Sequence, residues 1–552
     1  MSGASPTRAR RVAEHPGAGG PDVPQSRALS GRRLGAAALL LGASVLLSRV
    51  LGFARDMVLA HRLGVGTATD AFSAAFQIPD LLNYLLAGGA LAIAFTPLYL
   101  RALQREGEAS AARLFHTVLG TLGAVTIVLT VVLWVYADAA IALQFGDFDA
   151  ETRALTTRLT RIVLPAQIFF VTGGIVRAVL MAHGRFGAQA AAPLLYNGAI
   201  IVGGLLGSGV EGFAWGALAG AVLGQLVVPL GQLRRVTSLG ARVAPLDPRF
   251  RIYLVAALPL MIGLSLTTVD EWYERWFGHA IGVGVVASLA FARRLMMAPV
   301  AVVGQAVATA ALPTLAALHA EGREAELDRR LGQTLRGTVA VAVLTGGVLV
   351  AFALPIVRVV YERGRFDADD SARVAGLLAI LAFAVPGWVS QQVAVRAFFA
   401  REEMWRPMLL GTGAALAAVP LYRALGNVLG AQGLALAGAI AITTNALLTL
   451  AWARVRFGGP SLAALGDTAL RVLGIAAVAG VVGRQVAFGQ PGFVGAALDL
   501  LAGGAVYGLT AIAGIRWVGD ASSRDAVARA WARLRRSVPV APGAAPPSQD
   551  VE

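Results

Sequence analysis

The chain has 552 residues, of which 57% are hydrophobic and only 14% are charged. A soluble domain carries about a quarter charged residues, so these charges are too few to cover a water-facing surface. Cysteine is absent and the 47 basic residues are all arginine, which excludes disulfides, thiolate nucleophiles and cysteine-ligated metals. The net charge of +15 lies mostly in short loops and tails, so we interpret it as membrane topology and expect no nucleic-acid partner.

Apolar stretches long enough to cross a hydrocarbon core of ~30 Å recur along almost the whole chain. Because lipid cannot satisfy backbone N–H groups, such stretches are expected to be helices. Residues 1–33 precede them and hold six arginines against two acids, which predicts a disordered cytoplasmic tail. About fourteen spans follow, at 34–54, 71–100, 114–137, 153–181, 188–207, 212–233, 252–277, 283–315, 337–360, 372–400, 407–424, 431–453, 467–487 and 493–517.

The charges of the loops predict that both termini are cytoplasmic. Loops assigned to the cytoplasm are basic, as at Arg101 and Arg105, whereas loops assigned to the other side are acidic, as at Asp147 and Asp149. This asymmetry is what the positive-inside rule expects. Residues 519–552, which are basic and then rich in proline and alanine, are predicted to be a second cytoplasmic tail.

The chain also repeats itself at a spacing close to 218 residues. FDAETR at 148–153 has a counterpart in FDADDS at 366–371, and Pro165 pairs with Pro386 in the same order. The repeat unit holds six spans, an even number, so both copies should have the same orientation in the membrane. We therefore predict an all-α polytopic membrane protein with two parallel six-helix lobes, at 34–240 and 241–457, and two additional helices at 458–518. The substrate path should lie between the lobes.

Charged side chains inside membrane spans are the first candidates for a functional site. The first span ends in SRVLGFARD, which contains Arg49, Arg55 and Asp56. Arg49 lies almost two turns deeper than Arg55, and for it we favour a position facing a cavity. Arg55 and Asp56 could equally extend to the membrane interface. Asp70 opens the second span, where the alternative is an acid stabilised by the helix dipole.

The seventh span carries the densest charge, in VDEWYERWF. Glu271 and Arg275 are four residues apart and could neutralise each other as an ion pair. Asp270 and Glu274 also share a helix face, and two carboxylates together suit a cation or proton site. The alternative is a helix end that lies in interfacial water.

The eighth span opens with FARRLMMAP, in which Arg293 and Arg294 present two adjacent cations near the cavity or the interface. The sequence shows no phosphate-binding loop, no nucleophile elbow and no histidine pair with metal spacing. These features favour a transporter over an enzyme.

The segment SRVLGFARDMVLAHRLGVGTATDAFSAAFQIPDLLNYLLAGGALAIAFTP closely resembles the MurJ/MviN family of proposed lipid II flippases. That family belongs to the multidrug/oligosaccharidyl-lipid/polysaccharide exporter superfamily. The likeness continues through FARRLMMAPVAVVGQAVATAALPTL, RGRFDADDSARVAGLLA and VRAFFAREEMWRPM, and so covers roughly residues 40–455. It implies two six-helix lobes around a V-shaped cavity, with the two extra helices forming a groove for a polyprenyl tail.

The same resemblance implies which residues form the sites. It assigns substrate binding to Arg49, Arg55, Asp70 and Arg294. A sodium site reported for relatives uses a seventh-span carboxylate that aligns best with Glu274, with Asp270 close enough to compete.

Several positions depart from the family pattern. The second span usually reads LPNLLRRLFAEGAF in the family and IPDLLNYLLAGGAL here. Asn83 and Tyr84 therefore replace two arginines, and Gly88 replaces a glutamate. Arg293 stands where an aspartate is common.

Together these observations predict a flippase that moves lipid II, an undecaprenyl-diphosphate-linked peptidoglycan precursor, across the cytoplasmic membrane of a bacterium by alternating access. No cofactor is expected; a monovalent cation (sodium or proton) or the membrane potential, worth about 2.3 kcal/mol per charge per 100 mV, would supply the energy. Expected partners are the undecaprenyl-linked glycan lipid, membrane lipids and, as candidates, cell-wall synthesis proteins. The alternatives are an exporter of another polyprenyl-linked glycan, a cation-coupled drug antiporter of the same superfamily, and a non-transporting membrane scaffold.

Overall fold

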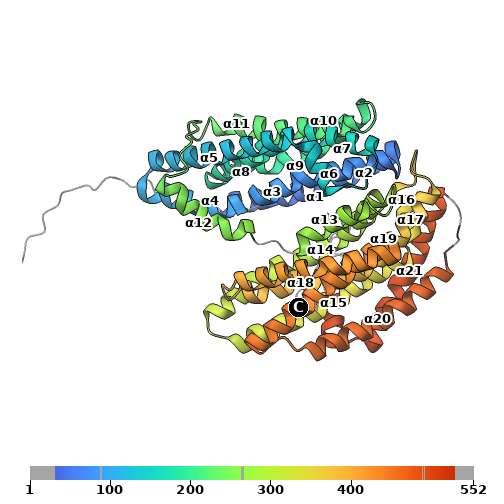
Figure 1. The fold of residues 1–552 in the computed structure, drawn as a ribbon. Helices are drawn as coiled ribbons and strands as arrows, with labels where there is room; N and C mark the ends of the chain where they lie inside the picture. Colours follow the sequence, from blue (N-terminus) through green and yellow to red (C-terminus); the bar gives the residue numbers. More distant parts are fainter. Residues whose placement is uncertain (1–30, 87–89, 263–265, 488, 490–491, 529–552) are drawn as a thin grey trace, which may run out of the picture.

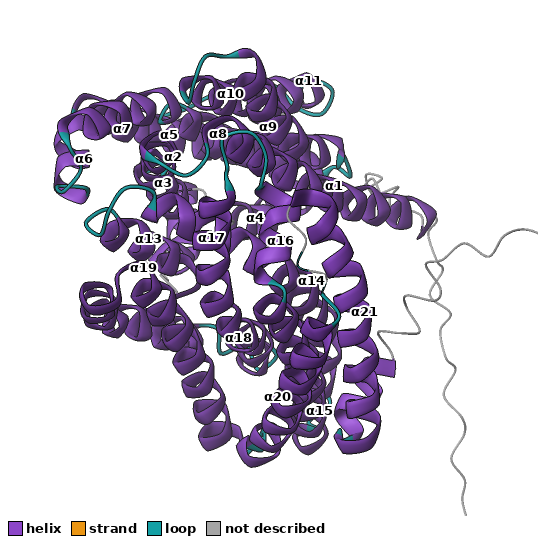
Figure 2. Cartoon of the chain, turned by 90° about the vertical axis from the view of Figure 1, so that its right-hand side faces the viewer, coloured by secondary structure: helices purple, strands orange, loops and turns teal. Residues whose placement is uncertain are grey.

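The computed structural model describes residues 31–86, 90–262, 266–487, 489 and 492–528. Within these ranges the chain is helical and contains no strand, which confirms the all-α prediction (Figure 1, Figure 2). The predicted tail at 1–33 lies outside the described residues except for its last three positions. Of the predicted tail at 519–552, residues 519–528 are described, and 521–528 are helical.

Helices α1 to α12 form the first bundle, and α13 to α19 form the second bundle. The first contains α1 (Gly31–Leu63), α2 (Thr67–Ala75), α3 (Gln77–Leu86), α4 (Ala90–Glu106), α5 (Glu108–Val135), α6 (Ala137–Gln144), α7 (Ala150–Val163), α8 (Ala166–Ala182), α9 (Gly187–Leu206), α10 (Glu211–Ala221), a π-helical turn (Val222–Val227), α11 (Val228–Leu233) and α12 (Pro248–Ile262). The second contains α13 (Leu266–Gly278), α14 (Val285–Ala320), α15 (Glu324–Ala351), α16 (Ala353–Tyr361), α17 (Ala368–Leu381), α18 (Val385–Phe399) and α19 (Trp405–Phe457). A C-terminal pair follows, α20 (Leu462–Gln485) and α21 (Gly492–Val518).

The helices coincide with the predicted membrane spans. Among the described residues, 10 helical stretches are long and apolar enough to cross a membrane. One of them, α19, contains two predicted spans that meet at Gly430, where the backbone leaves helical geometry with φ 60°. Three further predicted spans correspond to α1, to α2–α4 and to the pair α12 and α13. The chain is therefore a multi-pass membrane protein.

The seventh predicted span, 252–277, is divided between the two bundles. Helix α12 packs against α4 and α5, and its Phe250 and Tyr253 belong to the core of the first bundle. Helix α13 instead packs against α14 and α19. In the packing, the boundary between the bundles therefore lies between α12 and α13, later than the residue 240 expected from the repeat.

The two copies of the sequence repeat start equivalent helices in the same way. Asp149 caps α7 by accepting hydrogen bonds from the backbone N–H groups of Glu151 and Thr152, both at 2.9 Å. Asp367 caps α17 by accepting from the backbone N–H of Asp370, also at 2.9 Å. An aspartate at this position satisfies N–H groups that have no partner within the helix. The FDA motifs are therefore helix start signals.

The two bundles contact each other at one end of the molecule. We call this end the closed end, and it consists of the segments 61–66, 278–284 and 362–367. Figure 1 shows this end at the right, where α2, α16 and α17 lie, and Figure 2 faces it. There the Arg365 backbone N–H donates to the His61 carbonyl at 3.0 Å. Gly64 has φ +66°, and a Cβ on it would lie 2.5 Å from the Arg365 carbonyl oxygen. Only glycine allows so close an approach of the two backbones.

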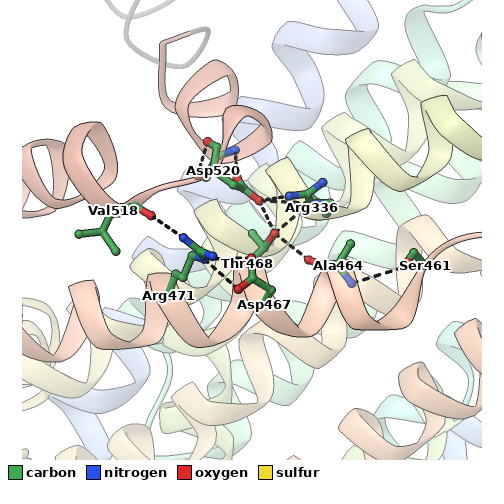
Figure 3. A network of polar contacts seen from close by, with 9 residues as sticks. Arg336, Ser461, Ala464, Asp467, Thr468, Arg471, Val518 and Asp520 are labelled. Carbon is green, nitrogen blue, oxygen red and sulfur yellow. Dashed lines mark hydrogen bonds and ion pairs between the residues drawn. The ribbon is translucent and has the colours of Figure 1, made fainter.

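The C-terminal pair is fastened to the second bundle by a polar network (Figure 3). Asp520, just after α21, accepts from Arg336 Nε of α15 at 3.1 Å and from the Thr468 hydroxyl of α20. Further along, the Tyr507 hydroxyl of α21 donates to the Leu344 carbonyl of α15 at 2.7 Å. The pair is therefore part of the same body as the second bundle.

Candidate functional site

A cavity of about 230 Å³ lies between the bundles, below the closed end. Helices α1, α2, α3 and α9 contribute its wall from the first bundle, and α13 and α14 from the second. Its polar and charged lining residues are Arg55, Thr69, Ser73, Asp80, Tyr196, Glu271, Arg275 and Arg294. The wall therefore combines arginines and acids from both bundles.

At one side of the cavity, the carboxylate of Asp56 is held between two guanidinium groups. Arg55 Nε and Nη2 both lie 3.1 Å from Asp56 Oδ1. From the other bundle, Arg294 Nη1 donates to Asp56 Oδ2 at 2.9 Å. Arg55 is steadied further by Asn197, whose side-chain oxygen accepts from its Nη1 at 3.2 Å. Two of the residues assigned to substrate binding thus converge on a single anionic group.

A second ion-pair group surrounds Arg275 of α13. Its Nη1 donates to Asp80 Oδ2 at 3.0 Å and to Gln77 Oε1 at 3.3 Å, both on α3 of the first bundle. Its Nη2 pairs with Glu271 one turn away, which confirms the ion pair predicted from the four-residue spacing. The three arginines and three carboxylates of the two groups balance in charge.

The acidic pair of the seventh span has a partner that the sequence analysis did not assign. Arg293 Nη1 lies 2.6 Å from Asp270 Oδ2, and Arg293 Nε donates to Glu274 Oε2 at 2.7 Å. All three side chains are buried between α13 and α14. Arg293 therefore points into the second bundle, whereas its neighbour Arg294 lines the cavity. Within the described residues, Asp270 Oδ1 has no hydrogen-bond partner.

Two of the expected substrate-binding residues lie away from the cavity wall. Asp70 is buried at the joint between the bundles, where its carboxylate accepts from the backbone N–H groups of Gly284 and Ala287 at 2.5 and 2.7 Å. These groups open α14, so Asp70 caps a helix of the opposite bundle. Arg49 lies half-buried on α1 and is not among the lining residues.

Sequence reasoning missed Asp80 and undervalued Arg275. The available signal was the three-residue spacing of Gln77 and Asp80, which places two acceptors on one face of α3. Near them, Tyr84, which replaces a family arginine, makes an edge-to-face contact with Trp272 of the second bundle at 5.8 Å between ring centroids. The substitution thus puts an aromatic contact between the bundles beside the Asp80–Arg275 pair.

Comparison with known proteins identifies the family. The family model described as lipid II flippase MurJ matches residues 59–498. The chain belongs to the lipid II flippase MurJ family. The probable lipid II flippase MurJ of Rhizobium meliloti (strain 1021) is 30% identical over 429 residues, which cover 75% of this chain and 79% of that protein. The lipid II flippase MurJ of Burkholderia cenocepacia is 28% identical over 435 residues, which cover 76% of this chain and 84% of that protein.

Solved structures support the same fold. A lipid II flippase MurJ in an inward closed conformation matches with a TM-score of 0.74 at 20% identity, covering 87% of this chain and 99% of that one. An inward-facing multidrug resistance transporter of the MATE family, within the MOP superfamily, matches with a TM-score of 0.63 at 16% identity, covering 78% of this chain and 99% of that one. At these identities the likeness shows the fold alone, and it confirms the predicted all-α membrane fold of this MurJ-family chain.

Proposed function

We propose that this MurJ-family chain is a lipid II flippase, which moves an undecaprenyl-diphosphate-linked peptidoglycan precursor across the cytoplasmic membrane by alternating access. Family membership supports the substrate class, a lipid-linked precursor. The two-bundle fold, with charged residues of both bundles around one cavity, supports the transport mechanism. On this proposal the chain is a transporter and not an enzyme.

One observation carries the proposal furthest: Arg55 and Arg294, two arginines of the cavity wall from opposite bundles, both bind the carboxylate of Asp56 beside the cavity. The Asp56 carboxylate stands in for an anionic group of a substrate. A planar guanidinium offers paired N–H donors that match carboxylate and phosphate oxygens alike. A diphosphate that enters this cavity would compete with Asp56 for the same two cations, and would connect the bundles through itself.

The predicted topology assigns the closed end to one side of the membrane. With both termini in the cytoplasm, the loop at 61–66 follows the first span and faces outward. The bundles are then joined on the outside, so the cavity would be reached from the cytoplasmic side. This is the state in which a flippase would accept a precursor made in the cytoplasm.

The coupling of transport to an energy source is proposed to involve the cluster of Asp270, Glu274 and Arg293. Two ionised carboxylates and one guanidinium leave one uncompensated negative charge in a buried place. Such a charge is stabilised when a monovalent cation or a proton joins it. The unpartnered Asp270 Oδ1 is the atom that remains open to that cation.

The proposed function is tested most directly at Arg294. We expect Arg294→Ala to insert in the membrane but to lose lipid II flipping, because a charge-assisted bond to phosphate contributes about 1.5–3 kcal/mol. Arg294→Lys should recover only part of the activity, since a point charge lacks the paired donors. The readouts are complementation of a conditional lipid II flippase depletion and lipid II translocation in the same cells.

The matched control is Arg158→Ala, which removes an exposed arginine whose ion pair with Glu211 lies outside the cavity. Wild-type flipping by Arg294→Ala would contradict the anion site. Failure of the wild-type chain to complement, with transport of another polyprenyl-linked glycan instead, would assign it to an exporter of that glycan.

A further inference from the structure

Two ion pairs of the same design connect the bundles beside the cavity, and both of their arginines line it. In each, a carboxylate of the first bundle accepts from an arginine of the second: Asp56 from Arg294 at 2.9 Å, and Asp80 from Arg275 at 3.0 Å. Both arginines line the same cavity of about 230 Å³. The two anion positions are therefore held by arginines that face one common space.

The Arg275 guanidinium is fixed in place, whereas the carboxylate that it holds is accessible. The side chain of Arg275 is 9% exposed, but those of Asp80 and Glu271 are 42% and 46% exposed. Glu271 lies one turn away on the same helix, so it keeps the guanidinium oriented even when Asp80 moves. Asp80 can turn into cavity water without leaving a buried charge behind, since Glu271 still neutralises Arg275.

Arg275 also has donor capacity that the protein does not use. A guanidinium carries five N–H donors, and Nη1 and Nη2 engage Gln77, Asp80 and Glu271. Its Nε is buried and has no hydrogen-bond partner among the described residues. Arg275 therefore retains a donor beyond those that Gln77, Asp80 and Glu271 occupy.

We propose that Arg275 is a further substrate-binding residue, and that Asp80 occupies the position taken by the second phosphoryl group of a bound diphosphate. Asp56 occupies the position of the first, between Arg55 and Arg294. This inference rests on the proposed function and deepens it, because it explains how the site distinguishes a diphosphate from a monophosphate. No bond is made or broken; two carboxylates exchange places with two phosphoryl groups.

The exchange has a mechanical consequence. The Asp56–Arg294 and Asp80–Arg275 pairs tie α1 and α3 to α14 and α13. When a diphosphate takes both arginines, both ties are released at once, whereas a monophosphate releases one. Binding of the correct headgroup thereby removes part of what holds the bundles together at the level of the cavity.

The test compares two lipids that differ by one phosphoryl group. The purified full-length chain is titrated with undecaprenyl diphosphate and with undecaprenyl monophosphate, and the two Kd values are measured for each variant. We expect Arg275→Gln to weaken diphosphate binding about tenfold and to change monophosphate binding by less than about twofold. Asp80→Asn should strengthen diphosphate binding, because a neutral amide competes less well for Arg275.

Matched controls are Arg158→Gln and Glu211→Gln, which remove the two halves of an ion pair between helices outside the cavity. Neither should change the Kd for either lipid. Thermal unfolding of each variant establishes that the compared proteins are folded. If Arg275→Gln does not insert in the membrane, the sign of the Asp80→Asn effect decides, since that variant retains all three cavity arginines.

Wild-type diphosphate binding by Arg275→Gln would overturn the inference, and so would weaker diphosphate binding by Asp80→Asn. Failure of the proposed function would look different. In that case Arg294→Gln would leave binding of both lipids unchanged, whereas the Arg275 inference is judged by the ratio of the two Kd values.

Discussion

Replacement of Gly64 by alanine should open the closed end. The added Cβ would lie 2.5 Å from the Arg365 carbonyl oxygen and 3.0 Å from its carbon, closer than nonbonded atoms approach. The positive φ costs an alanine about 1–2 kcal/mol wherever the loop keeps this shape, whether the bundles are together or apart. The clash arises only when they are together. At about 1–3 kcal/mol for an overpacked contact, it should shift the balance toward the separated state roughly 5- to 150-fold.

Spin labels can measure this shift, because the chain contains no cysteine that would be labelled in the background. Leu143 on α6 and Val283 before α14 lie on opposite bundles near the closed end and are 85% and 67% exposed. Cysteines at these two positions would report the separation by pulsed electron paramagnetic resonance. Gly64→Ala should move the population to longer distances.

The matched control is Gly209→Ala. Gly209 has nearly the same backbone angle, φ +61°, but no atom within 4 Å of the added Cβ. It therefore reproduces the conformational cost without the clash. If the two variants give the same distance distribution, the close approach at Gly64 does not control closure, and the reasoning is wrong.

Two further predictions concern ions. Glu274→Gln and Asp270→Asn should each abolish the dependence of transport on a sodium, proton or potential gradient imposed on liposomes. Binding of the glycan lipid should stay largely intact. Wild-type rates and ion dependence in both variants would exclude the Asp270–Glu274–Arg293 cluster as the coupling site. His279, outside the spans, packs edge-on against the stacked rings of Phe145 and Phe148 of the other bundle, and its Nε2 lies 3.5 Å from Asp147 Oδ2. Burial lowers the pKa of its imidazole, and Asp147 only partly opposes this, so the contact should be strongest above the ordinary pKa of about 6.5 and weaken as the pH falls below it. The spin-label distances should lengthen on acidification in wild type and stay constant in His279→Phe; a pH-independent wild type would refute this.

Contacts between residues of one helix or one turn could be predicted from the sequence. The Glu271–Arg275 pair follows from a four-residue spacing, and the caps Asp149 and Asp367 follow from the position of an acid before a helix. The position of Asp70 also allows a helix-terminal acid, and Asp70 does cap a helix. The helix is α14, however, more than two hundred residues further along the chain. Local chemistry identified the kind of contact, but not the partner.

Features that depend on how helices are rotated against each other could not be predicted. Arg293 and Arg294 are neighbours, yet one joins Asp270 and Glu274 inside the second bundle and the other lines the cavity. Adjacent residues on a helix point about 100° apart, so one of them must leave any face that holds the other. The packing of α13 against α14 decides which of the two arginines faces the cavity. The spacing of residues in the sequence does not determine this packing.

The attachment of α20 and α21 makes the two moving parts of the molecule unequal. Arg336, Asp520 and Tyr507 fasten this pair to α15 and its neighbours, and Arg484 Nε adds a bond of 2.7 Å to the Ala351 carbonyl. When two rigid bodies rotate against each other in a viscous medium, the body with less drag turns further. In the part of the chain that the structure describes, the first bundle carries no such helix pair, so it should rotate further relative to the bilayer. The second bundle, which is broadened by α20 and α21, should stay nearly fixed in the bilayer.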